Sequence, residues 1–268
     1  MEDILLVEKQ GHICTLTPNR PNNENRLTHE TFLRLKEAVN SANKDSDVRV
    51  IILRGSGEEM FSRGIDLGEE VKRGARPEDL RKQVNQFRDD IEGAMESMIY
   101  GRCPTIAMIY GDCLAGGTAV AVACDFRICS DISRFSLWTV LVGQTFQWQG
   151  IQRMLDLIGP ANAKEILLAG GLTSAVRAKE MGLVNFLVPA KDVFNTTLAF
   201  AQEIAEKAPL AVSGTKEIIS RLYKTKNNPT DADKADFQAI MDRCSNSEDA
   251  KEGPKAALEG RRPNFSGR

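Results

Sequence analysis

The chain has 268 residues, of which 42% are hydrophobic and 27% are charged, and its formal net charge is −2. This length suffices to bury a large core as a single α/β domain with an appendage. A nearly balanced charge supplies no field that attracts nucleic acid or an anionic membrane, so neither is expected as a partner. No apolar run approaches the roughly 18 residues of a membrane-spanning helix.

Cysteine and histidine usage argues against a metal site or a disulfide framework. The six cysteines form no CxxC pair, and the two histidines, His12 and His29, are poorly placed for a zinc cluster. We therefore expect reduced thiols, a cytoplasmic location and no metal. The acidic N-terminus lacks an apolar run long enough for a signal peptide. Arg261, Arg262 and Arg268 make the C-terminus basic, which is typical of a solvated tail or of a segment that meets a polyanionic ligand.

Strands and helices alternate in the first half of the chain. In order, the pattern predicts a hairpin of strands 4–7 and 12–16, a helix over 28–43, a strand over 48–53, a loop over 61–67, a helix over 77–100 and a strand over 105–110. The strand VRVIIL carries β-branched side chains on both faces, as expected for burial on both sides. Leu80, Val84 and Ile91 share one face of the helix over 77–100.

Helices dominate the second half. The pattern predicts a helix over 116–124, a strand over 126–129, helices over 150–157 and 161–169, a helix over 174–181, a strand over 183–188, and helices over 192–207, 209–224 and 230–246. The order of elements is that of an α/β core followed by a helical part. We expect the core to span residues 1–190 and the helical C-terminal region to span residues 191–268.

Two glycine-containing loops follow predicted buried strands. The first, residues 61–67, reads FSRGIDL, and the second, residues 111–118, reads GDCLAGGT and opens a predicted helix. Ligands of open α/β folds bind at the carboxyl ends of strands, and glycine lets a backbone approach a ligand closely. Amides at a helix N-terminus favour negative charge. Two such loops side by side would aim two N–H groups at one oxygen.

Further segments stand in a fixed order around these loops. NRP precedes NRL, VRVIILRGSG precedes FSRGIDL, CPTIAMIYGDCLAGG precedes CDFRICSD, and IQRM, LAG, MGLV and RRPNF follow. In order and spacing they resemble the NRP…NAL, FxAGxDL, KPVIAAVNGxxxGGG, CDxxxA and TQRL motifs of the crotonase (enoyl-CoA hydratase/isomerase) superfamily. The resemblance implies a spiral of ββα turns that forms two roughly perpendicular sheets, with C-terminal helices that mediate trimerisation.

The same resemblance implies an acyl-CoA substrate, no separate cofactor because coenzyme A is part of the substrate, and a homotrimer or a dimer of trimers. It assigns an oxyanion hole to the backbone amides of Arg63 and Gly116. These donors would stabilise the enolate of a thioester, and one such donor is worth about 2.7–4 kcal/mol of barrier. The implied substrate-binding and CoA-binding residues are Arg26, Ser62, Arg63, Gly64, Ile65, Asp66, Leu114, Gly116, Trp138 and Phe146.

The sequence departs from the family at both catalytic glutamates. Ala119 stands three residues after the oxyanion glycine, and Thr139 stands in the turn that carries the second glutamate. Neither side chain can act as a general base at neutral pH. No acid occurs in residues 135–149, where Trp138, Phe146 and Trp148 instead suggest an aromatic acyl pocket. Standard hydration of an enoyl-CoA is therefore in doubt.

Three explanations for the missing glutamates remain open. A carboxylate from elsewhere would replace them, with Asp66, Glu69, Asp112, Asp89, Asp90, Glu92 and Glu96 as the candidates. Alternatively, the enzyme would decarboxylate or hydrolyse a substituted acyl-CoA, since loss of CO₂ creates the enolate without a protein base. The alternative of another class is a CoA-binding paralogue that does not catalyse.

Overall fold

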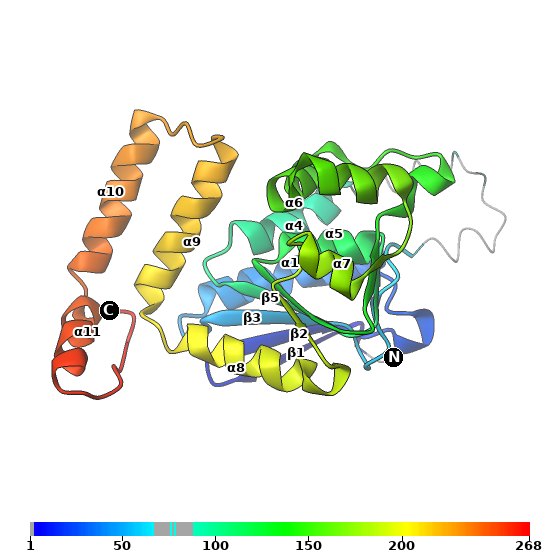
Figure 1. Cartoon of the computed structure of the whole chain (residues 1–268). Coiled ribbons are helices and arrows are strands. Elements are labelled where there is room, and N and C mark those ends of the chain that lie inside the picture. Colours follow the sequence, from blue (N-terminus) through cyan, green and yellow to red (C-terminus); the bar gives the residue numbers. More distant parts are fainter. Residues whose placement is uncertain (1–2, 67–75, 77, 79–87) are drawn as a thin grey trace.

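The structure is a computed structural model that describes residues 3–66, 76, 78 and 88–268 (Figure 1). Ten strands in this part of the chain form two sheets. The six-stranded sheet has the order β1 (Leu5–Gln10), β2 (Ile13–Pro18), β3 (Val50–Arg54), β5 (Thr105–Ile109), β7 (Phe126–Ser130) and β10 (Phe186–Val188). The four-stranded sheet has the order β4 (Met60–Ser62), β6 (Asp112–Leu114), β8 (Arg134–Ser136) and β9 (Thr173–Ser174).

Successive strands alternate between the two sheets. β3, β5 and β7 run parallel in the larger sheet, and β4, β6 and β8, which follow them in sequence, run parallel in the smaller one. The larger sheet begins with the predicted antiparallel hairpin, in which Gly11 has φ +57°. This alternation is the expected spiral of ββα turns, and the mixed α/β prediction is confirmed.

Helices cover both faces of the larger sheet (Figure 1). The helices of the described residues are α1 (His29–Lys44), α4 (Arg88–Ile99), α5 (Gly116–Ala123), α6 (Trp148–Ala169), α7 (Ala175–Glu180), α8 (Val193–Ala205), α9 (Pro209–Lys224), α10 (Asp231–Ser245) and α11 (Glu248–Leu258), with 3₁₀ turns η1 (Pro21–Asn23), η2 (Trp138–Val142) and η3 (Ala190–Asp192). None of these helices is both long and apolar enough to cross a bilayer.

The strand VRVIIL is buried on both faces, as predicted. Val50 and Ile52 pack toward α8, whereas Ile51 and Leu53 pack into the larger cluster beneath α1, α4 and α5. Side chains of a strand alternate between its faces, so a strand with a core on each side needs apolar residues at every position.

Several predicted elements differ from the structure. The loop predicted over 61–67 contains part of β4, and β6 was not predicted at all. The helix predicted over 230–246 is confirmed as α10, but it is not the last helix, because α11 follows it and contains Pro254. Of the helix predicted over 77–100, the described residues confirm α4, and the remainder lies outside them. The break predicted between two helices is confirmed at Gly159, where φ is +73° and ψ is 166° within α6.

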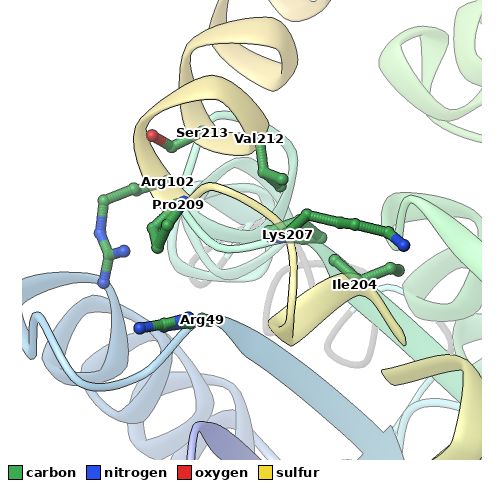
Figure 2. A pocket seen from close by; sticks show the side chains of 8 residues that line it. Arg49, Arg102, Ile204, Lys207, Pro209, Val212 and Ser213 are labelled. Atoms are coloured by element: carbon green, nitrogen blue, oxygen red, sulfur yellow. The ribbon is translucent and has the colours of Figure 1, made fainter. Parts of the chain in front are cut away.

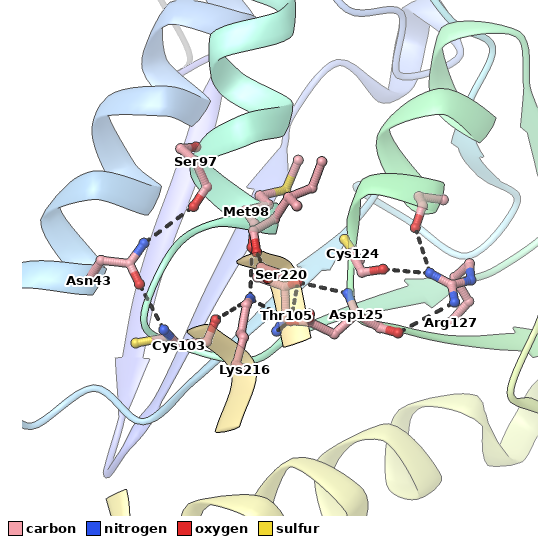
Figure 3. Close-up of polar contacts among 12 residues, drawn as sticks. Asn43, Ser97, Met98, Cys103, Thr105, Cys124, Asp125, Arg127, Lys216 and Ser220 are labelled. Carbon is pink, nitrogen blue, oxygen red and sulfur yellow. Dashed lines mark hydrogen bonds and ion pairs between the residues drawn. The ribbon is translucent and has the colours of Figure 1, made fainter. Parts of the chain in front are cut away.

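Helix α8 packs against the larger sheet, whereas α9, α10 and α11 extend from the core as an arm (Figure 1). The domain boundary expected at residue 190 stays a prediction. Helix α8 lies beyond that residue in sequence and still covers the larger sheet. A buried lysine of α9 holds the arm to the core (Figure 3). The ammonium of Lys216 donates to Met98 O at 2.7 Å, to Cys103 O at 2.8 Å and to Asp125 Oδ2 at 2.5 Å.

The cysteines are free, and most are buried. Burial raises the pKa of the Cys124 thiol to about 12 and that of the Cys129 thiol to about 12. The thiolate is the reactive form of cysteine, so these two side chains stay protonated and inert near neutral pH.

The basic C-terminal tail is bound to α11. Arg261 donates to both carboxylate oxygens of Glu252, at 2.6 and 2.9 Å, and the amide of Asn264 donates to the same carboxylate at 2.8 Å. Asp249 accepts hydrogen bonds from the amides of Ser266 and Gly267, at 2.7 and 2.9 Å. The tail is therefore held by acids of this chain, although Arg262 itself remains exposed.

Acidification is expected to release this tail. The Arg261 guanidinium, with the Asn264 amide, lowers the pKa of Glu252 from its ordinary value of 4.5 to about 2. A carboxyl group whose pKa is lowered by folding stabilises the folded state above its unfolded pKa and loses that contribution as pH falls. The protection factor of the Asn264 amide, which compares its exchange rate with the intrinsic rate at the same pH, should fall as the pH falls from about 4.5 to about 2. An Asn264 amide that exchanges at the intrinsic rate throughout this pH range in the wild-type protein would contradict this docking, and Glu252→Gln should abolish the transition.

Candidate active site

The two glycine loops meet where the neighbouring strands β4 and β6 end. A Cβ added to Gly64, whose φ is +104°, would lie 2.8 Å from the amide nitrogen of Gly116 and 2.9 Å from the Cβ of Ala115. A Cβ on Gly117 would lie 2.6 Å from the carbonyl oxygen of Ser62. Since real Cβ atoms almost never approach so closely, both glycines are required for the loops to interlock.

Gly116 begins α5, so its amide is one of the first-turn donors that have no acceptor inside the helix. The preceding residue, Ala115, turns the chain with φ 48° and ψ −116°, and no side chain caps the helix there. A non-glycine residue in this region stores strain, and such strain concentrates at functional sites. The exposed end of the helix favours a partially negative oxygen beside the Gly116 amide.

The second predicted donor already has an acceptor. The amide of Arg63 donates to the carbonyl oxygen of Glu24 at 3.0 Å, and the amide of Gly64 donates to Ser62 Oγ at 3.0 Å. The Ser62 hydroxyl in turn donates to the carbonyl oxygen of Asn25 at 2.8 Å. A substrate oxygen at Arg63 would therefore share its N–H with Glu24 or displace that carbonyl.

The Arg63 side chain is held beside the site. Its guanidinium donates to Glu24 Oε1 at 2.8 Å and lies 5.6 Å from the centre of the Trp138 ring. The other oxygen of Glu24 accepts from Arg26 at 2.9 Å. One carboxylate thus joins two of the predicted CoA-binding arginines, a role that no sequence motif indicated for Glu24.

The remaining residues of the first loop are also tied down. Ile65 forms a parallel bridge with Leu27, and its side chain packs on the core. Asp66 forms an ion pair with Arg20 at 2.5 Å, and both side chains are largely buried. Arg20 also donates to the carbonyl oxygen of Arg26 at 2.9 Å, which fixes the segment that faces the loop.

The predicted acyl pocket is only partly assembled from the residues named for it. Leu114 is buried in β6, and Phe146 packs its ring against Gly150. Ala119 is partly exposed on α5. The hydroxyl of Thr139 in η2 is buried and has no hydrogen-bond partner in the described part of the chain. Trp148 is 73% exposed, so it forms no wall of a pocket in this chain.

The candidate replacement acids occupy different surroundings. Asp112 accepts two hydrogen bonds from Arg134, Asp90 pairs with His29, Asp89 and Glu96 are exposed, and Glu69 lies outside the described residues. Glu92 forms a buried ion pair with Arg153 of α6, with side chains 12% and 17% exposed. Its second oxygen, Oε2, is buried and accepts no hydrogen bond from the residues that the structure describes.

A separate small cavity lies where α8 turns into α9 (Figure 2). It encloses about 10 Å³ and is lined by Arg49, Arg102, Pro104, Ile204, Lys207, Pro209, Val212 and Ser213. A space of roughly this size holds one water molecule, so it cannot take a thioester.

Comparison with known proteins identifies the class of protein that this fold and site define. The sequence pattern of the enoyl-CoA hydratase/isomerase family matches residues 8–268. A crotonyl-CoA hydratase from Syntrophomonas wolfei is 32% identical over 263 residues, which cover 97% of each protein. A peroxisomal Δ(3,5)-Δ(2,4)-dienoyl-CoA isomerase from Arabidopsis thaliana is 32% identical over 230 residues, 82% of this chain and 81% of the relative.

Solved structures agree with the sequence match. The crystal structure of an enoyl-CoA hydratase/carnithine racemase from Magnetospirillum magneticum has a TM-score of 0.90 and 29% identity, and the match covers 100% of this chain and 97% of that one. This chain therefore belongs to the enoyl-CoA hydratase/isomerase family, the crotonase superfamily that its motifs predicted. It is an enzyme of the hydratase/isomerase type.

Proposed function

We propose that this enzyme binds an acyl-CoA thioester by its carbonyl oxygen and acts on it through an enolate. The amides of Gly116 and Arg63 are the two donors of the oxyanion hole. The contact between Gly64 and Gly116 carries this proposal, because the two loops lie against each other and residue 64 has no Cβ to cover the Gly116 amide. Acyl-CoA chemistry is also the common property of the named relatives.

The reaction that follows enolate formation is not ordinary hydration. Hydration requires groups that position water and transfer protons, and the two expected positions hold Ala119 and Thr139. The buried hydroxyl of Thr139 can orient a ligand by a hydrogen bond but cannot accept a proton at neutral pH. Proton transfer within the acyl chain, as in an isomerase, fits these residues better if a carboxylate is supplied from another element.

A second candidate is decarboxylation or hydrolysis of a substituted acyl-CoA. The lack of any acid in residues 135–149 favours this candidate, because loss of CO₂ generates the enolate and no protein base is needed to remove a proton. Incubation with malonyl-type, β,γ-unsaturated and α,β-unsaturated CoA esters, followed by mass spectrometry and NMR, separates loss of CO₂, double-bond migration and gain of water. Rapid gain of water by crotonyl-CoA would overturn the interpretation of positions 119 and 139.

Removal of one amide tests the oxyanion hole. Gly116→Pro deletes the N–H at the first position of α5, where proline is tolerated. Gly116→Ala retains the N–H, and the Cβ in either variant would lie 3.1 Å from Ile65 Cγ1, so alanine is a matched control. Turnover should fall about 100- to 1,000-fold in the proline variant relative to the alanine variant.

Binding is measured separately by titration with acetoacetyl-CoA and detection of the enolate absorbance. The folded wild-type protein should bind acetoacetyl-CoA as its enolate, and Gly116→Pro should lose that absorbance. Absence of binding by the folded wild-type protein would overturn the proposal. Tight binding without turnover of any ester, unaffected by Gly116→Pro, would instead indicate a non-catalytic CoA-binding protein.

The proposal includes assembly into a homotrimer or a dimer of trimers. The arm formed by α9, α10 and α11 supports this part, because it extends from the core and leaves Ile219, Tyr223 and Met241 about half exposed (Figure 1). Exposed apolar side chains on projecting helices are typical of surfaces between subunits.

A further inference from the structure

The proposed function needs a general base, and the carboxylate of Glu92 is the candidate for that base in the described part of the chain. An enolate formed by proton removal needs a base, and neither Ala119 nor Thr139 provides one. Among the candidate acids that the structure describes, Glu92 alone has a buried oxygen without a hydrogen-bond partner. The inference about Glu92 that follows rests on the proposed function.

The position of Glu92 on α4 is set by the neighbours of that helix. Ile91, Ala94, Met95 and Met98 form its buried face. One flank meets α1, since Asp90 pairs with His29 and Ser97 accepts from Asn43. The opposite flank meets α6, where Arg153 pairs with Glu92 and contacts the Met95 sulfur at 3.7 Å. Glu92 therefore lies between α4 and α6.

Helix α5 contacts both α4 and α6 and carries the oxyanion-hole amide. Its incompletely buried residues are Gly116, Ala119 and Val122, which recur every three positions and so share one face. The other residues of α5 are buried. This partly exposed stripe thus begins at the Gly116 amide, includes Ala119 at the position of the family's glutamate and ends at Val122.

Three of the five buried side-chain atoms without a partner in the described residues lie on α4, on η2 and just before α6, whereas the other two, Arg49 Nε and Thr197 Oγ1, lie elsewhere in the molecule. Besides Glu92 Oε2, the hydroxyl of Thr139 and Oε1 of Gln147 are buried without partners. Thr139 belongs to η2, which packs on α6, and Gln147 occupies the N-cap position of α6 without a capping hydrogen bond from its side chain. Buried polar atoms normally have a protein or water partner, so unpaired atoms on adjacent segments indicate a place for a polar ligand group.

We propose that Glu92 is the catalytic base of this enzyme. Its Oε2 accepts the α-proton of a β,γ-unsaturated acyl-CoA, the C–H electron pair enters the enolate, and the thioester oxygen is held by the Gly116 and Arg63 amides. The same oxygen then returns the proton to the γ-carbon, which leaves an α,β-unsaturated thioester and the original carboxylate. No other reactant is consumed. Arg153 positions the base by holding the other oxygen of the carboxylate.

Deuterium incorporation tests this assignment. 3-Butenoyl-CoA is incubated with the protein in D₂O, and exchange and double-bond migration are followed by NMR. Glu92→Gln should reduce both rates at least about 100-fold, as expected for loss of a general base. Acetoacetyl-CoA should still bind as its enolate with an affinity within about threefold of wild type, because both oxyanion donors remain. Glu96→Gln, an exposed position on the same helix, is the matched control and should change neither measurement.

The pH profile distinguishes catalysis from a structural ion pair. In the wild-type protein the exchange rate should fall at acid pH as Glu92 becomes protonated. Arg153→Met removes the neighbouring cation, which favours the protonated form, so this acidic limb should move to higher pH. If Glu92→Gln fails to fold because Arg153 is left unpaired, the double variant Glu92→Gln/Arg153→Met removes both charges and should remain without exchange.

Two results would overturn the assignment of Glu92. One is exchange in Glu92→Gln, or in the double variant, within about threefold of wild type. The other is a wild-type protein that binds acetoacetyl-CoA as the enolate but neither exchanges an α-hydrogen nor moves the double bond of 3-butenoyl-CoA. Failure of the wild-type protein to bind acetoacetyl-CoA would instead contradict the proposed function itself.

Discussion

Gly64→Ala is expected to abolish binding of the acetoacetyl-CoA enolate while the fold persists. The new Cβ would lie 2.8 Å from the Gly116 nitrogen and would separate the two loops or cover the amide. Loss of one oxyanion donor corresponds to about 2.7–4 kcal/mol, or a 100- to 1,000-fold loss of turnover. Because alanine is strained at the positive φ of this position, the substitution should also lower the free energy of unfolding by about 1–3 kcal/mol.

Gly57→Ala separates these two effects. Gly57 also has a positive φ, +78°, but an added Cβ meets no atom within 4 Å. This variant should lose stability in urea unfolding as Gly64→Ala does, yet should retain turnover and enolate binding. Equal loss of function in both variants would show that the decrease comes from backbone strain and not from the contact at Gly116.

Lys216→Met is expected to detach the arm of α9, α10 and α11 from the core. The methionine leaves Asp125 and the carbonyl oxygens of Met98 and Cys103 without their shared donor. Breaking a buried ion pair costs about 3–5 kcal/mol, and the lower end applies here because the Asp125 side chain is 28% exposed. Urea unfolding should show this decrease, and limited proteolysis should cut the chain near the junction of α8 and α9.

Lys224→Met provides the control for the loss of a lysine from the same helix. Lys224 is exposed and lies 5.5 Å from the centre of the Tyr100 ring. An exposed substitution of this kind usually changes stability by less than about 0.5 kcal/mol. If both variants unfolded at the same urea concentration as the wild-type protein, the buried contacts of Lys216 would not hold the arm.

The larger sheet was predictable from sequence and the smaller sheet was not. β3 and β5 have five residues each, of which four in succession are apolar, long enough to show burial on both faces. β4 and β6 have three residues each and lie inside loops whose glycines suggest turns. Runs this short carry no periodic signal, so their pairing is decided by the tertiary structure. α11 was missed for a related reason, because its Gly253-Pro254 pair is typical of a turn.

The backbone of the site was predictable in part. Glycine indicates where a chain must approach closely, which is why the loops that carry Gly64 and Gly116 could be expected side by side from the sequence, whereas the donors Arg63 and Gly116 were implied by the family resemblance. The hydrogen bond between the Glu24 carbonyl and the Arg63 amide could not be predicted, because every residue has a carbonyl group and its direction depends on φ and ψ. Glu92 could be nominated only alongside neighbouring acids, because which flank of α4 faces α6 depends on packing and not on spacing.

In the proposed oxyanion hole, the hydrogen bond from the Arg63 amide to the Glu24 carbonyl would affect selectivity between the neutral thioester and its enolate. A neutral thioester that takes over this amide exchanges one neutral hydrogen bond for another, at little net gain. An enolate oxygen carries more charge, and charge-assisted hydrogen bonds are roughly twice as strong as neutral ones. Because the Arg63 amide must give up its hydrogen bond to the Glu24 carbonyl, a neutral thioester gains little binding free energy there. An enolate still gains the difference between the stronger bond that it forms and the bond that is lost. In the proposed reaction, Glu24 therefore makes this donor discriminate in favour of the activated form, which raises turnover without tightening the hold on unreacted substrate.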